Sequence, residues 1–134
     1  YDQLAQTVEV NKSIKISQVT LDELLTNSEI ISIHLPLTPE TKNIINSEIL
    51  DKMKKDVILI NTARGGIVNE DSLFDFLKNY PKSFASFDVF EAEPAFDNKL
   101  LTLENFFATS HRASLSIDGI LSMGRAAIRG LIKK

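Results

Sequence analysis

The sequence predicts an α/β fold built on a mostly parallel sheet. Four apolar runs are strand-length, they are continuous rather than alternating, and segments with helical spacing lie between them. Continuous runs are typical of strands that are covered on both faces, and strands that alternate with helices form βαβ units. The four runs are 29–35, 56–61, 84–90 and 105–110.

The composition is that of one soluble globular domain. The 134 residues are 43% hydrophobic and 25% charged, and no apolar run approaches the length of about 18 residues that a membrane span needs. Lys and Arg total 15 against 18 Asp and Glu, so the net charge of -3 gives no electrostatic basis for binding nucleic acid or an anionic membrane. The absence of cysteine excludes disulfides and cysteine-built metal sites, and it fits a reducing, cytoplasmic compartment.

The first predicted helix begins at Thr20. Thr20 and Glu23 have the spacing of a capping box, in which each side chain satisfies a backbone donor of the other residue. Ahead of this helix, residues 8–10 or 14–16 could add a short fifth strand. Ser47 is expected to cap a second, short helix between the first two runs. The apolar residues of that helix are Ile49, Leu50 and Met53.

Two further helices follow the second and fourth runs. Asn69 is expected to cap the first of them, with Glu70 and Asp71 placing negative charge at its positive end. This helix is expected to bury Leu73, Phe74 and Leu77. A long helix within 115–134 is expected to begin at about Ser116, because its apolar residues recur on one face. These are Ile117, Ile120, Leu121, Gly124, Ile128 and Leu131.

Polar residues whose side chains could take part in catalysis or binding lie at the ends of the four runs. His34 ends the first run, Arg64 follows the second, Asp88 and Glu93 lie late in or after the third, and His111 follows the fourth. In open α/β sheets, ligands bind beyond the carboxyl ends of the strands. We therefore expect an arginine, a carboxylate cluster and a histidine to converge on one edge of the sheet.

The chemistry of three of these residues suits a 2-keto acid. A histidine beside a carboxylate is a general acid–base pair, because the anion favours the protonated ring. A guanidinium offers two parallel donors to a substrate carboxylate and fixes it for reaction. Arg64, Glu93 and His111 would together suit reduction of a 2-keto acid by hydride transfer, or the reverse oxidation, with a cofactor supplying the hydride.

Each residue also has a structural interpretation that the sequence leaves open. His34 and His111 could be structural histidines at strand ends, and Glu93 could be a solvated loop acid. The Gly65–Gly66 pair could serve only a turn that needs positive φ. Asp88, inside an apolar run, could accept structural hydrogen bonds instead of contacting a ligand.

Other kinds of site find no support in the spacing. The histidines and acids lack the clustered spacing of metal ligands, so we expect no metal. No G-x-S-x-G nucleophile elbow is present. The five glycines cannot form a G-x-G-x-x-G turn, so the chain contains no pyrophosphate-binding turn of that kind.

Four motifs, at 32–43, 59–68, 87–94 and 109–114, resemble the NAD-dependent D-isomer-specific 2-hydroxyacid dehydrogenases in order and spacing. The phosphoglycerate dehydrogenases are the branch that the chain resembles most. The resemblance implies an incomplete Rossmann-like, doubly wound parallel sheet with flanking helices. Residues 1–134 would be part of the NAD-binding domain, lacking the glycine-rich turn and the substrate domain, and the helix in 115–134 would lead back toward that domain.

The resemblance also implies roles for individual residues. Arg64 would bind the substrate carboxylate, His111 would be the acid–base, and Glu93 would orient His111 and favour its protonated form. NAD would be the cofactor, with Asp2 on its adenine-side ribose, which favours NAD over NADP. The residues that would contact the cofactor are Asp2, Leu35, Pro36, Thr41, Thr62, Ala63, Arg64, Asp88, His111 and Ser114.

Two residues depart from the family pattern beside the predicted acid–base. Ser110 replaces the usual proline and is expected to loosen the loop that holds His111. Arg112 replaces an aliphatic residue and is expected to place a cation beside the imidazole, which opposes its protonation.

The parent protein is therefore expected to be a cytoplasmic homodimer that acts on a small 2-hydroxy or 2-keto acid. The 134 residues alone are expected to be inactive, because the phosphate-binding turn and the wall of the substrate domain are missing. Two alternatives stay open. One is a non-enzymatic NAD(H)-responsive binding module of the corepressor kind, and the other is a truncated remnant without function.

Overall fold

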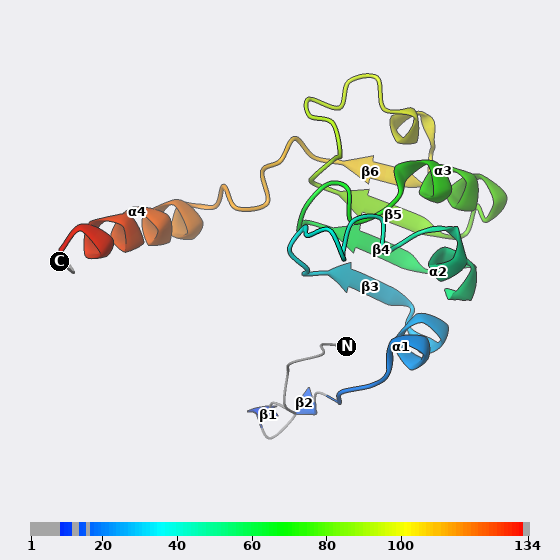
Figure 1. The fold of residues 1–134 in the computed structure, drawn as a ribbon, viewed down its shortest axis with the longest axis horizontal. Helices are drawn as coiled ribbons and strands as arrows, with labels where there is room; N and C mark the ends of the chain where they lie inside the picture. Colours follow the sequence, from blue (N-terminus) through cyan, green and yellow to red (C-terminus); the bar gives the residue numbers. More distant parts are fainter. Residues whose placement is uncertain (1–8, 12–13, 16, 133–134) are drawn as a thin grey trace.

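Four parallel strands form the larger sheet of the described part of the chain (Figure 1). The computed structural model describes residues 9–11, 14–15 and 17–132. The strands follow one another across the sheet in chain order, β3-β4-β5-β6. Each predicted apolar run contains one of them, so the predicted parallel α/β sheet is confirmed. Their bounds are β3 Ile30–Ile33, β4 Ile58–Asn61, β5 Phe84–Phe87 and β6 Phe106–Ala108.

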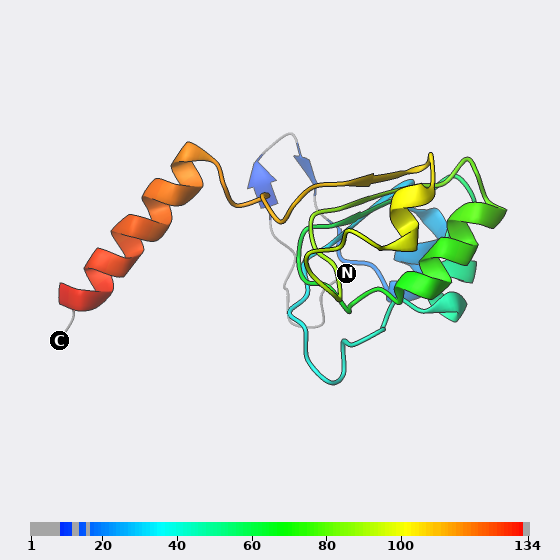
Figure 2. The same cartoon turned by 90° about the horizontal axis from the view of Figure 1, so that it is seen from above.

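Helices cover one face of this sheet. Figure 2 shows the blue, teal and green helices on the same side of the strands. In β3, Ile31 and Ile33 are buried while Ile30 on the opposite face is 60% exposed. Right-handed crossovers between neighbours that follow in chain order place every connecting helix on the same side. The expectation that the strands are covered on both faces therefore does not hold within the described residues. The helices are α1 Leu21–Asn27, α2 Ser47–Lys52, α3 Glu70–Asn79 and the 3-10 helix η1 Lys99–Thr102.

The first two helices begin at side-chain caps. At α1 the predicted capping box is confirmed, because the Glu23 backbone N–H donates to Thr20 Oγ1 at 3.2 Å and the Thr20 N–H donates to Glu23 Oε2 at 2.9 Å. At α2 the prediction of Ser47 as the cap is wrong by one residue. Asn46 Oδ1 accepts the Ile49 N–H at 3.1 Å, so Ser47 is the first helical residue.

Helix α3 begins where the sequence predicts. Asn69 caps it by accepting the Ser72 N–H at 2.8 Å. The buried face was predicted with Phe74, but Phe76 is the buried phenylalanine and Phe74 is only partly buried. This face packs into a core that lies between the helices and the sheet. Its fully buried members include Leu25, Leu50, Leu59, Ile67, Leu73, Leu77, Phe87 and Leu100.

The two ends of the described chain lie outside this core. The short strands β1 (Glu9–Asn11) and β2 (Ile14–Lys15) pair antiparallel with each other as a separate sheet, so the predicted fifth strand does not join the main one. The predicted long helix is confirmed as α4, Ile117–Ile132, and it projects away from the sheet (Figures 1 and 2). Among the described residues, no helix has the length and apolarity to cross a membrane.

Candidate active site

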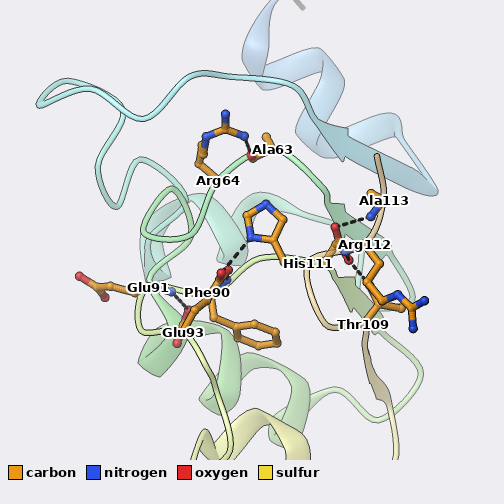
Figure 3. Close-up of polar contacts among 11 residues, drawn as sticks. Ala63, Arg64, Phe90, Glu91, Glu93, Thr109, His111, Arg112 and Ala113 are labelled. Carbon is orange, nitrogen blue, oxygen red and sulfur yellow. Dashed lines mark hydrogen bonds and ion pairs between the residues drawn. The ribbon is translucent and has the colours of Figure 1, made fainter. Parts of the chain in front are cut away.

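Three loops bring the predicted catalytic residues to the carboxyl edge of the sheet. Arg64 lies after β4, Glu93 after β5 and His111 after β6. Because these strands are parallel neighbours, their following loops lie side by side. Figure 3 shows the His111 ring with Glu93 on one side and Arg64 beyond the other.

Glu93 and His111 form a hydrogen-bonded pair. His111 Nδ1 lies 2.8 Å from Glu93 Oε2, and Glu93 Oε1 accepts the Phe90 backbone N–H at 2.9 Å. The bond to His111, and then the bond from Phe90, hold the pKa of the Glu93 carboxyl below its ordinary value. An ionised Glu93 favours a proton on Nδ1 and leaves Nε2 on the side where Arg64 lies (Figure 3). The pair also borders a cleft of about 560 Å³.

Asp88 holds the loop that carries His111. His111 has φ 55, a left-handed conformation that is uncommon for any residue except glycine. Around it, the Arg112 N–H donates to Asp88 Oδ1 at 2.6 Å, the Ala113 N–H donates to Oδ2 at 2.7 Å, and the Thr109 hydroxyl also donates to Oδ1. Asp88, only 3% exposed, therefore has the structural role that the sequence left open, and Oδ2 retains capacity for one further donor.

These three donors also decide the charge of Asp88. Burial raises the pKa of the Asp88 carboxyl, but the Thr109 hydroxyl and the N–H groups of Arg112 and Ala113 lower it by more, so it lies below its ordinary value. A carboxylate that accepts several hydrogen bonds is stabilised in its charged form. Asp88 thus places a buried negative charge under the His111 loop.

We expect acid to loosen this loop. The folded pKa of Asp88 lies below the unfolded value of about 3.9, so its ionised form contributes stability that is present above that pH and is lost as the pH falls through the folded pKa. Urea unfolding between pH 6 and pH 2 measures the effect. Asp88→Asn should lower the free energy of unfolding by about 1–3 kcal/mol at pH 6. On acidification, the free energy of unfolding of this variant should fall by less than that of the unchanged chain. Asp75→Asn, an exposed acid on α3, is the control; equal acid sensitivity of Asp88→Asn and Asp75→Asn would contradict the assignment.

The structure contradicts the expectation for Arg112, one of the two departures from the family pattern. Figure 3 shows the Arg112 side chain pointing away from the His111 ring, so its cation does not lie against the imidazole. Ser110 is exposed, and the loop around it is held by the three hydrogen bonds to Asp88. Asp88 therefore holds the loop that carries His111, and the loosening effect of Ser110 stays a prediction.

Asn61 holds the loop that carries Arg64. Asn61 is 1% exposed at the end of β4, its Oδ1 accepts the Ala63 N–H at 3.1 Å, and its Nδ2 donates to the Arg64 carbonyl at 3.0 Å. The Arg64 side chain is exposed, and Nη1 donates to the Ala63 carbonyl at 2.6 Å. The guanidinium keeps further donors for an anion. Sequence reasoning missed Asn61, although an amide that ends a buried apolar strand is itself a signal of a fixed hydrogen bond.

The two glycines after Arg64 have different roles. A Cβ on Gly65 would lie 1.9 Å from the carbonyl oxygen of Phe90, so Gly65 permits direct contact between the loops after β4 and β5. Gly66 has φ +77 and serves the turn. The turn interpretation therefore applies to Gly66, whereas Gly65 brings the Arg64 loop against the loop that leads to Glu93.

Most of the residues predicted to contact the cofactor lie in loops that follow the strands. Leu35, Pro36, Thr62 and Ser114 are exposed in loops at the carboxyl edge, and Ala63 is partly buried. The Thr41 side chain points into its own loop, because its hydroxyl donates to the Pro36 carbonyl at 2.7 Å and accepts the Thr38 N–H at 2.7 Å.

Of the two remaining predicted residues, only His34 is described, and it directly follows β3. His34 is bonded to Ser32 Oγ at 2.9 Å, and Asp2 lies outside the described residues. Among the residues that the structure describes, no cluster of three or more His, Asp or Glu could hold a metal. The carboxyl-edge residues nevertheless fit a dinucleotide: Leu35 and Leu37 offer exposed apolar surface, and Asp88 Oδ2 can accept a further hydrogen bond.

A parallel sheet with functional loops at its carboxyl edge defines a Rossmann-like α/β domain. The chain belongs to the NAD binding domain family of the D-isomer specific 2-hydroxyacid dehydrogenases, whose family model matches residues 1–113. The expected family and its cofactor, NAD, are thereby confirmed.

Known proteins resemble both the sequence and the structure. D-3-phosphoglycerate dehydrogenase of Bacillus subtilis is 46% identical over 105 residues, which are 78% of this chain and 20% of the relative. A crystal structure of a D-isomer specific 2-hydroxyacid dehydrogenase from Polaromonas has a TM-score of 0.79 at 31% identity, over 92% of this chain and 40% of that one. NAD-dependent formate dehydrogenase from Staphylococcus aureus, solved with NAD, has a TM-score of 0.70 at 38% identity, over 75% and 31%. The chain spans two fifths or less of each relative's length.

Proposed function

We propose that this chain is part of an NAD-dependent dehydrogenase that interconverts a D-2-hydroxy acid and a 2-keto acid. The observation that carries the proposal is the 2.8 Å pair of Glu93 and His111 on the same edge as Arg64. D-3-phosphoglycerate dehydrogenase is the particular enzyme that we favour, because proteins of that name are 46%, 42% and 40% identical to this chain. A glycerate dehydrogenase and a glyoxylate reductase are 48% and 47% identical, so their reactions are the alternatives for the same assay. The family assignment supports the reaction class.

Each of the three residues has one role in this proposal. The Arg64 guanidinium binds the substrate carboxylate through its free donors. His111 Nε2 gives a proton to the keto oxygen during reduction, or takes it from the hydroxyl during oxidation. Glu93 accepts a hydrogen bond from Nδ1 and so orients the ring. When bound, NAD would accept or supply the hydride.

The remaining contacts belong to the cofactor and to the parent protein. Leu35, Pro36, Thr62, Ala63, Asp88 and Ser114 would line the cofactor cleft, together with Asp2 and Thr41. We assign residues 1–134 to part of the NAD-binding domain, with the helix in 115–134 leading toward a substrate domain. A cytoplasmic homodimer as the parent, and the inactivity of these 134 residues alone, stay predictions.

Arg64→Ala tests this function in the full-length protein. We expect kcat/KM for small 2-keto acids with NADH to fall by about 10²-fold or more, because the substrate carboxylate loses its bidentate partner. The matched control is Lys82→Ala, which removes an exposed cation before β5, at the opposite edge of the sheet. Near-unchanged kinetics of Arg64→Ala would refute the role. No turnover by the unchanged protein, with NADH-dependent capture of a partner protein, would favour the binding module.

A further inference from the structure

A carboxylate outside the catalytic set clamps the loop that carries Glu93. This loop, residues 91–98, contains no helix or strand. Glu70 Oε1 accepts the Glu91 backbone N–H at 2.8 Å, and Glu70 Oε2 accepts Asn98 Nδ2 at 2.6 Å. One side chain therefore holds both ends of the loop, which are far from it in sequence.

The position of Glu70 is itself fixed. Glu70 is the first residue of α3, directly after the capping residue Asn69. The positive end of the helix stabilises a carboxylate there, and α3 is anchored in the core by Leu73 and Leu77. At the far end of the loop, Asn98 Oδ1 accepts the Leu100 N–H at 3.0 Å and so joins the clamp to η1.

We infer that Glu70 is a positioning residue for the acid–base pair, because it fixes the loop from which Glu93 reaches His111. The inference rests on the proposed function of that pair. Glu93 Oε2 must stay within hydrogen-bond distance of Nδ1 to orient the ring, and its own loop is tied to the helix layer by Glu70. A shift of about 1 Å in a positioning group far from the reacting atoms can cost about 10²-fold in rate.

Other charges near the pair do not replace this clamp. Asp88 accepts backbone N–H groups of the His111 loop. Figure 3 shows Arg64 beyond the ring and the Arg112 guanidinium pointing away from it. The Glu91 side chain forms an ion pair with Lys42 at 3.3 Å, but both groups are about half exposed. Exposed pairs of this kind contribute little to stability. Glu70 is therefore the clamp expected to decide where the loop lies.

The test compares Glu70→Gln with Asp71→Asn in the full-length protein. Both substitutions remove one negative charge from the first turn of α3. Glutamine at position 70 keeps one acceptor oxygen but presents an NH₂ group to one of the two donors. Asp71 instead contacts Lys99 Nζ at 2.6 Å and is exposed, so its loss leaves the Glu93 loop tied. Glu93→Gln is the reference for direct loss of the pair.

Two measurements are made on each variant: the pH dependence of kcat, and hydrogen–deuterium exchange of the segment 90–98. For Glu70→Gln we expect faster exchange, a fall in kcat of about 10-fold, and a shift of the limb of the pH profile that the acid–base pair produces. Glu93→Gln should shift that limb in the same direction and further. Asp71→Asn should move neither quantity. Glu70→Asp, which keeps the charge on a shorter side chain, should give an intermediate result if Glu70→Gln does not fold.

Faster exchange without a shift of the pH limb would show a merely structural clamp and would overturn the inference. If Glu93→Gln shifts the limb and neither Glu70 variant does, only the inference falls. If Glu93→Gln itself has no effect on kcat or on its pH dependence, the proposed function falls and takes the inference with it. An Asp71→Asn effect equal to that of Glu70→Gln would assign the change to helix charge and would also overturn the inference.

Discussion

His111→Asn is expected to lower kcat of the full-length protein by about 10²–10⁴-fold, the usual contribution of a positioned general acid–base. Asparagine cannot exchange a proton as the ring does, so the keto oxygen loses its donor and the hydroxyl loses its acceptor. The substitution is chosen because His111 has φ 55, and asparagine is the residue besides glycine that adopts this conformation most readily. The loop should keep its fold, so that the lost activity reports proton transfer. Steady-state kinetics with a keto acid and NADH measure the effect.

The other histidine supplies the control for this experiment. His34 is exposed and bonded to Ser32, so His34→Asn removes an imidazole outside the acid–base pair. We expect kcat within about 2-fold of the unchanged protein, as for most surface substitutions. A His111→Asn protein with nearly full turnover would show that another group moves the proton.

Gly65→Ala is expected to disable the site and to destabilise the fold. The new Cβ would lie 1.9 Å from the Phe90 carbonyl oxygen and 2.1 Å from its carbon, distances that real Cβ atoms do not show. Both neighbours are backbone atoms, so the loops after β4 and β5 must separate. We expect a loss of about 1–3 kcal/mol in the free energy of unfolding. Because Arg64 precedes the clash and Glu93 follows it, kcat/KM should fall by about 10²-fold or more.

A second glycine separates this clash from the general effect of adding a methyl group. A Cβ on Gly124, within α4, meets nothing within 4 Å. Gly124→Ala should leave the free energy of unfolding of this chain unchanged or raise it by up to about 1 kcal/mol, because alanine favours a helix. Denaturant unfolding of the Gly65→Ala and Gly124→Ala variants measures the difference. Equal unfolding midpoints would mean that the loops after β4 and β5 accommodate the methyl group at position 65.

The sequence predicts local features of the fold better than contacts between distant segments. Thr20 and Asn69 act through neighbours three residues away, so their caps could be predicted from spacing. Asn46 and Ser47 are both good capping residues, and spacing alone does not choose between them. The buried face of α3 includes Phe76 instead of Phe74 because the exact phase of a helix against its sheet depends on packing.

The site shows the same division. The convergence of Arg64, Glu93 and His111 on one edge could be predicted, because the ends of parallel strands share an edge. The clamp of Glu70 on a loop more than 20 residues away could not, because only the folded chain brings the two together. Similarly, continuous apolar runs predict strands that are covered on both faces, but within the described residues helices cover only one face.

Strand order sets how far apart in the chain the paired residues are. Ile30 pairs with Ile58, Ile58 with Phe84, and Ala85 with Phe106, so every partner is fewer than 30 residues away. Short separations keep the entropic cost of closing each loop low and favour fast folding. During synthesis, each of β4, β5 and β6 can pair as soon as it is made, because the strand before it in the chain is its partner. The loops that carry Arg64 and Glu93 can therefore form first, and the acid–base pair is completed only after β6, the last strand of this sheet in the described residues, has been synthesised together with His111.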